Sequence, residues 1–165
     1  MRYQNNVVKK PWGYEYLAYE NDECALWFLH IKENQRTSMH SHPQKTTGLI
    51  LLDGEAELSF LADSRKLVAP SKVMIRRGLF HSTKALSENA LIFEIETPKD
   101  KHDLVRLNDS YGRSKLTYEG KKFESSKSSK DLWIQEPDLG KSIEYNFANC
   151  KLKVETIDNI EVINN

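Results

Sequence analysis

Two histidines, His40 and His42, stand two residues apart shortly before an apolar run that ends at Asp53-Gly54. An Asp-Gly pair at the end of such a run is a strong turn signal, so the segment predicts a β-strand followed by a tight turn. In a strand, residues i and i+2 point to the same face. The two imidazoles are therefore expected to lie together, where they can chelate one metal ion.

A third histidine completes a candidate metal site. His81 follows another apolar strand and the glycine turn Arg77-Gly78-Leu79-Phe80. Three neutral imidazoles suit zinc, iron, copper, nickel or manganese better than magnesium. Three protein ligands also leave positions open for water or substrate, as a catalytic metal ion requires. The alternative is that hydrogen bonds hold the three histidines together without a metal ion.

The segments around these histidines have the length and spacing of short β-strands. Apolar runs alternate with turn signals, and helical periodicity is almost absent before residue 98; the runs are Cys24–Ile31, Leu49–Asp53, Glu55–Leu61, Val68–Ile75 and Ala90–Thr97. This pattern predicts an all-β sandwich or barrel. A chain of 165 residues is long enough for one domain with a sizeable core.

The two histidine motifs resemble those of the cupin superfamily. Its first motif has His-x-His, a later glutamate and a glycine, which His40-Ser41-His42 and Gly54 match here; its second, Pro-x-Gly-x-x-His, is similar to the run 76–81. Two departures stand out, because Thr47 occupies the place of the metal-binding glutamate and an arginine replaces the proline. Over residues 7–113 the resemblance implies a single cupin (jelly-roll) β-barrel that binds a divalent metal ion through His40, His42 and His81.

Two further segments are similar to sugar cupins. Pro11-Trp12-Gly13-Tyr14-Glu15 resembles the opening of the cupin domain in type II mannose-6-phosphate isomerases, and Asp109-Ser110-Tyr111-Gly112-Arg113 resembles its close. This resemblance implies an isomerase or epimerase that acts on a sugar phosphate or nucleotide sugar in carbohydrate or surface-polysaccharide biosynthesis. Two alternatives stay open: a three-histidine iron dioxygenase, and a sugar-binding cupin that catalyses nothing.

An isomerase of this kind needs a base and a phosphate site. Glu94 and Glu96 share one face of the run Ala90–Thr97 and are the candidate bases if that face lines the barrel; otherwise they face solvent. Arginine binds phosphate in a bidentate manner, and a lysine supplies a point charge. The candidate cations lie in or beside the motifs and are Lys45, Arg76, Arg77, Arg106 and Arg113.

We expect two parts in the chain. Residues 1–113 form the predicted cupin domain, and residues 114–165 form a C-terminal extension that begins with the polar linker Lys121–Asp131. After the linker, alternating apolar residues in 143–147 and 152–154 predict a β-hairpin that packs on the barrel or on a partner chain. We expect a homodimer.

The charge balance and the cysteine content bear on the kind of partner and on the cellular location of the protein. Lys plus Arg and Asp plus Glu both number 24, and this balance argues against a large footprint on nucleic acid or membrane. Cys24 and Cys150 have no disulfide framework around them, and the N-terminus lacks an apolar signal region. These features predict a cytoplasmic protein.

Overall fold

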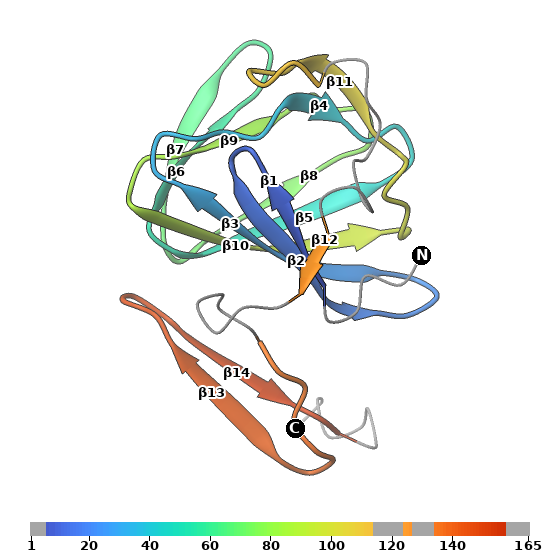
Figure 1. Ribbon diagram of the computed structural model, residues 1–165, viewed down its shortest axis with the longest axis vertical. Coiled ribbons are helices and arrows are strands. Elements are labelled where there is room, and N and C mark those ends of the chain that lie inside the picture. The colour runs from blue at the N-terminus through green and yellow to red at the C-terminus, as the bar shows by residue number, and fades with distance from the viewer. Residues whose placement is uncertain (1–5, 114–123, 127–133, 158–165) are drawn as a thin grey trace.

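The computed structural model describes residues 6–113, 124–126 and 134–157, and every regular element among them is a β-strand (Figure 1). The all-β prediction is therefore confirmed for the described part of the chain. No helix in that part is long and apolar enough to cross a membrane. The strands are β1 (Asn6–Lys10), β2 (Gly13–Glu20), β3 (Ala25–Lys32), β4 (Met39–Ser41), β5 (Thr46–Asp53), β6 (Glu55–Ser59), β7 (Ser64–Val68), β8 (Ser71–Ile75), β9 (Ser82–Ala85), β10 (Asn89–Thr97), β11 (Val105–Asn108), β12 (Glu124–Ser126), β13 (Ser142–Asn146) and β14 (Lys151–Glu155).

The strands form two main sheets that pack around one core. The larger sheet has seven strands in the order β12-β1-β2-β3-β10-β5-β8, and the smaller has the order β7-β6-β9. A short pair, β11 and β4, lies beside them. Among the described residues the strands do not form one closed barrel, although a bridge between His40 and His81 joins β4 to the start of β9.

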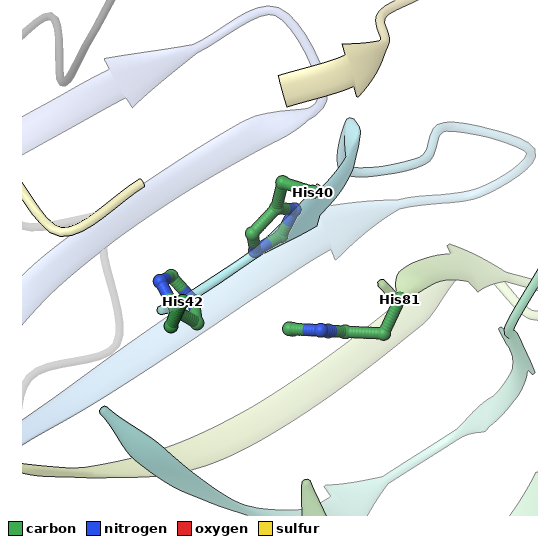
Figure 2. A group of neighbouring side chains, drawn as sticks. All are labelled: His40, His42 and His81. Atoms are coloured by element: carbon green, nitrogen blue, oxygen red, sulfur yellow. The ribbon is translucent and has the colours of Figure 1, made fainter. Parts of the chain in front are cut away.

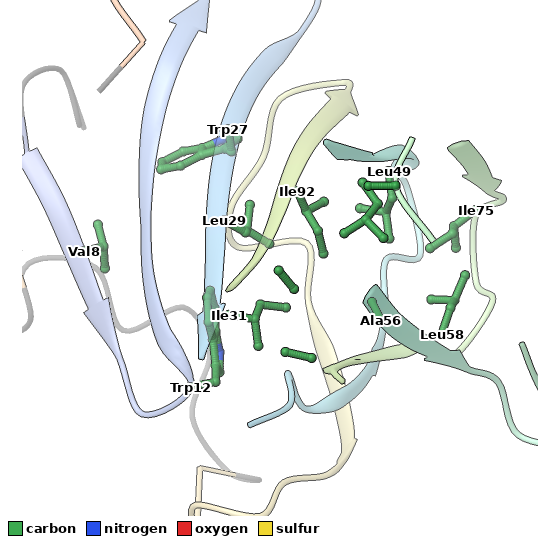
Figure 3. Packing of buried hydrophobic residues seen from close by; sticks show 14 of the residues in the cluster. Val8, Trp12, Trp27, Leu29, Ile31, Leu49, Ala56, Leu58, Ile75 and Ile92 are labelled. Carbon is green, nitrogen blue, oxygen red and sulfur yellow. The ribbon is translucent and has the colours of Figure 1, made fainter. Parts of the chain in front are cut away.

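The core lies between the two main sheets. Alternate residues of β3 point into it, so Trp27, Leu29 and Ile31 belong to the same buried cluster as Ala56 and Leu58 of β6 (Figure 3). The residues between them point to the other face of the large sheet. Both faces of β3 are largely buried, which explains why its sequence reads as a nearly continuous apolar run.

A C-terminal hairpin covers part of the outer face of the large sheet. Strands β13 and β14 pair antiparallel with Tyr145 opposite Leu152, and Figure 1 shows the hairpin below the main sheets. Both side chains pack against an outer-face cluster that includes Tyr16 and Phe28. Between the outer face and the hairpin runs a largely apolar groove of about 390 Å³. The C-terminal hairpin thus packs on the large sheet of the same chain. The division into two parts at residue 113 stays a prediction.

The predicted linker Lys121–Asp131 is partly wrong. Residues 124–126 form strand β12, which pairs with β1 at the edge of the large sheet. The polar composition that suggested a loop is also acceptable in an edge strand, because such a strand has one side open to solvent. The other residues of the expected linker lie outside the described residues.

Candidate metal centre

The two histidine motifs meet through backbone hydrogen bonds. His40 lies in β4 and His81 directly precedes β9, and each donates its backbone N–H to the carbonyl of the other, at 3.0 and 2.8 Å. The turn before His81 is held against the first motif by the N–H of Gly78, which donates to the carbonyl of His42 at 2.8 Å. Gly78 has φ of 74°, a conformation that favours glycine.

The three imidazoles gather around one space (Figure 2), and one ring nitrogen from each lies within 4.8 Å of the other two. On each ring, Nδ1 faces a backbone carbonyl: Ser38 for His40 at 2.7 Å, Asp103 for His42 at 2.6 Å and Leu79 for His81 at 3.0 Å. Because a carbonyl only accepts, Nδ1 carries the hydrogen and Nε2 keeps its lone pair. This arrangement is how proteins orient histidines that bind a metal ion.

The donor set fits a divalent transition metal. Nε2 of His42 is buried and has no hydrogen-bond partner among the described residues, although a buried polar atom normally has one. Burial, with a smaller effect of the Lys45 ammonium in the same direction, lowers the pKa of His42 and of His81 to about 4. Burial and the two neighbouring imidazoles hold the pKa of His40 well below its usual value. All three rings are therefore neutral at pH 7, which is the form that binds metal.

A small cavity of about 70 Å³ opens onto the three histidines. That space holds a few water molecules or the reacting end of a small ligand. Besides the histidines, five of the residues predicted from sequence line it: Lys45, Glu94, Glu96, Arg106 and Arg113. The face of β10 that carries the two glutamates thus points inward, and the solvent-facing alternative is wrong.

The cavity wall carries a network of buried charges centred on Lys101. Its Nζ lies 3.3 Å from a carboxylate oxygen of Glu96, 3.9 Å from one of Glu15 and 4.0 Å from one of Glu94. The same Nζ stands 3.8 Å from the ring centroid of Trp27. A second cation, Lys45, lies 2.7 Å from Glu96. The carboxylates thus enter the interior together with cations, as buried charges must.

The two glutamates of β10 differ in protonation. Burial raises the pKa of Glu94 to about 7, against the opposing effect of Lys101. Burial also opposes ionisation of Glu96, but Lys101 and Lys45 outweigh it and hold its pKa below the usual value. Near neutral pH, Glu94 can therefore take up or release a proton, whereas Glu96 stays charged.

The sequence did not predict two residues of this site, and two residues that it did predict lie outside the cavity. Glu15, on the inner face of β2, could have been found from strand alternation, but Lys101 lies in the loop between β10 and β11 and gave no signal. Arg106 lines the cavity beside His40, its register partner across β11 and β4. Arg76 and Arg77 are exposed on the turn after β8 and are not among the residues that line the cavity.

Comparisons of sequence find no match, since no protein-family model and no curated protein matches the chain. Comparison of structure does find relatives in shape. A variant of oxalate decarboxylase from Bacillus subtilis has a TM-score of 0.58 at 16% identity, covering 63% of this chain and 30% of that one. An RmlC-like cupin from Shewanella frigidimarina has a TM-score of 0.54 at 12% identity, covering 59% and 87%.

A third structure agrees with these two. KdgF from Halomonas sp. has a TM-score of 0.53 at 13% identity, covering 55% of this chain and 84% of that one. At such identities the likeness concerns the fold alone. The strand order, the two packed sheets and these neighbours together show that the chain has the cupin fold, which the sequence motifs predicted.

Proposed function

We propose that this protein is a metal-dependent enzyme that moves a proton next to the carbonyl of a small phosphorylated sugar, as an isomerase or epimerase does. The observation that carries the proposal is the placement of Glu94. Its carboxyl group, with a pKa raised to about 7, lines the same cavity as three neutral imidazoles that can hold a divalent metal ion. A proton-transfer group works best when its pKa lies near the working pH.

In the proposed reaction, the three histidines and the two glutamates of β10 have different roles. When bound by His40, His42 and His81, a divalent ion would polarise the carbonyl oxygen of the sugar. In an isomerisation, Glu94 takes the proton from the carbon next to the carbonyl to give an enediol and returns it to the former carbonyl carbon, while the proton of the neighbouring hydroxyl passes to the former carbonyl oxygen. An epimerisation would need, in addition to Glu94, a second proton donor on the opposite face of the carbon. Glu96 is a weaker base, because Lys101 and Lys45 lower its pKa and so reduce its tendency to accept a proton. The apolar side chains of Leu49 and Ile92 line the same cavity and limit access of water.

The charge of the cavity wall favours an anionic substrate. The lysines of the wall face carboxylates, and Arg113 is paired with Asp109 at 2.6 Å. Arg106 adds a further cation beside His40, and a bound metal ion would add two more positive charges. The enclosed space is small, so it admits the reacting end of a sugar while the phosphate stays at the mouth. A sugar phosphate meets both conditions.

The test is solvent isotope exchange. The protein, loaded in turn with Zn²⁺, Mn²⁺, Ni²⁺ and Fe²⁺, is incubated in D₂O with mannose 6-phosphate, fructose 6-phosphate and a nucleotide sugar, and deuterium at carbon is followed by NMR. We expect deuterium at the carbon next to the carbonyl of one substrate. Glu94→Gln should abolish the exchange and keep metal binding, while Glu57→Gln, a change outside the cavity lining, should leave it unchanged.

Metal analysis of the purified protein separates this proposal from the two alternatives. Iron that supports consumption of O₂ without any isotope exchange would indicate a dioxygenase. Binding of sugars with no exchange under any metal would indicate a protein that recognises a sugar without converting it. Either result would contradict the proposed proton transfer.

A further inference from the structure

The position that loses a carboxylate in the first motif lies directly opposite a glutamate. Thr47 on β5 and Glu96 on β10 are register partners on neighbouring strands. Directly opposed residues point to the same face of the sheet, with Cβ atoms about 4.5–5.5 Å apart. The exposed fractions of the two residues are 0% and 2%. A carboxylate carried at position 96 therefore enters the same part of the interior as a side chain at position 47.

Three buried atoms in this region have no hydrogen-bond partner among the described residues. They are Oγ1 of Thr47, Oε2 of Glu96 and Nε2 of His42. Such atoms are rare in folded proteins, because burying a polar atom without a hydrogen-bond partner is unfavourable. Glu96 and His42 also interact electrostatically, since the carboxylate raises the pKa of His42 and the imidazole lowers that of Glu96. The unpaired oxygen of Glu96 thus belongs to the surroundings of the imidazoles.

Lys45 makes a negative charge necessary at this place. Lys45 is only 1% exposed, and its ammonium group lowers the pKa of both His42 and His81. A field that disfavours a proton on these rings also disfavours a divalent cation held by them. The carboxylate of Glu96, 2.7 Å from Nζ of Lys45, opposes that field. Without Glu96, Lys45 would act on a bound ion without the carboxylate that lies 2.7 Å from its Nζ.

We propose that Glu96 supplies, from the neighbouring strand, the negative charge that Thr47 withholds from the metal centre. Glu96 acts as a positioning residue that stabilises the ion through its charge, and Lys45 sets how much of that charge the ion experiences. The inference rests on the metal binding of the proposed function. The candidate ligand atoms that lie within 4.8 Å of one another come from His40, His42 and His81 and do not include an oxygen of Glu96. Glu96 would therefore act on the ion through its charge and not as a direct ligand.

Metal affinity of the stripped protein tests this inference. Mn²⁺ and Zn²⁺ are titrated by calorimetry into the wild type, Glu96→Gln, Lys45→Met and the double variant Lys45→Met/Glu96→Gln. We expect Glu96→Gln to weaken binding about 10- to 100-fold, the usual loss for a residue behind the direct ligands. The effect should be larger for Mn²⁺, which prefers oxygen and charge. The double variant removes both charges and should bind nearly as tightly as the wild type.

Rescue from position 47 distinguishes charge from structure. Thr47→Glu placed in the Glu96→Gln background should restore most of the lost affinity, because it returns a carboxylate to the same face. Glu94→Gln is the matched control: it lies two residues away on the same inner face, is not ion-paired with Lys45, and should change metal affinity far less. Thermal unfolding of each metal-free variant reports whether it is folded.

The outcomes separate this inference from the proposed function. No binding of either metal by the wild type would overturn both. Tight binding by the wild type with equal affinity in folded Glu96→Gln would overturn the role of Glu96 and leave the proposed proton transfer standing. A loss in Glu96→Gln that neither Lys45→Met nor Thr47→Glu recovers would show a structural defect and would also overturn the role.

Discussion

At one end of the large sheet, the inner face carries charged side chains and the outer face carries apolar ones. At the histidine end, the inner face of β10 and its neighbours carries Glu94, Glu96 and Glu15, all buried. The outer face of the same strands carries Phe93 and Phe28, which pack with the C-terminal hairpin. In an ordinary antiparallel sheet the inner face is apolar and the outer face polar. Here the order is reversed at one end, so the two faces are stabilised by different physics.

This difference determines which conditions each face of the sheet should respond to. Packing on the outer face needs only matching apolar shapes, and its contribution depends little on pH or on bound ions. The inner face carries charges that cost free energy to bury and that remain there because each is compensated. Changes on the inner face should therefore be coupled to pH and to metal, and changes on the outer face should not.

The largest effect is expected for Lys101→Met, which leaves the carboxylates of Glu15, Glu94 and Glu96 without their shared cation. Breaking a buried ion pair by removing one partner costs about 3–5 kcal/mol. Lys101 lowers the pKa of Glu96, so its contribution is present above the ordinary carboxylate pKa of 4.5 and is lost as pH falls. At pH 5 that pairing is still intact, whereas Glu94, whose pKa is raised to about 7, is ionised mainly above that pH. The free energy of unfolding, measured in urea, should therefore drop more at pH 8 than at pH 5, and approach that of the wild type only well below pH 4.5.

Phe28→Ala is the matching change on the outer face. Phe28 is 1% exposed and stacks against Tyr16, with ring centroids 5.4 Å apart. Truncating a buried phenylalanine costs about 3–5 kcal/mol, the same range as the lost cation. Its cost should be equal at pH 5 and pH 8. A pH-dependent loss in Phe28→Ala, or a constant one in Lys101→Met, would contradict the contrast between the faces.

The second prediction concerns the histidines of the metal-free protein. His42 and His81 have a pKa of about 4 when folded and 6.5 as the ordinary value, so folding favours their neutral forms. Their contribution to stability is complete above pH 6.5 and is lost as pH falls toward 4, by about 2–3 kcal/mol for each. His81→Gln should flatten the fall of unfolding free energy over this range. The exposed His102→Gln is the control and should leave the slope as it is.

Much of the metal centre could be predicted from the sequence because it is encoded locally. The spacing of His40 and His42 and the glycine turn before His81 each specify a short piece of backbone, and the cupin resemblance supplies their relation. The alternation in 90–97 likewise placed Glu94 and Glu96 on one face correctly. Local periodicity is what strand pattern reveals most reliably.

The rest depends on contacts between segments distant in sequence. Lys101 meets Glu15 across 86 positions of the chain, and no local pattern announces such an ion pair. The exposed position of Arg77 was also hidden, because proximity to a motif in sequence does not show which way a turn points. The edge of the large sheet adds the same lesson: residues 124–126 lie in the predicted linker, yet β1 provides a partner strand for them.

The third prediction tests whether the two faces are independent. Leu152 of the hairpin is partly buried against the outer-face cluster and lines the apolar groove. Leu152→Ala should lower the free energy of unfolding by about 1–2 kcal/mol, less than a fully buried leucine would. Metal affinity, measured by the same titration as for the wild type, should not change. A parallel loss of metal affinity would show that the hairpin supports the metal centre through the sheet.

The smallest effect is expected for Arg77→Ala, and it sharpens the comparison at the mouth of the cavity. Arg77 lies exposed on a turn, where a single charge is screened by water and salt and contributes little. Arg106 lines the cavity beside His40, where a charged hydrogen bond to an anion contributes about 1.5–3 kcal/mol. With the metal-loaded protein and inorganic phosphate as the probe, Arg106→Ala should weaken binding roughly tenfold or more, and Arg77→Ala should change it by less than about twofold. Equal losses in the two variants would mean that the turn after β8 reaches the anion in solution, so that the exposed arginines and the buried wall act as one site.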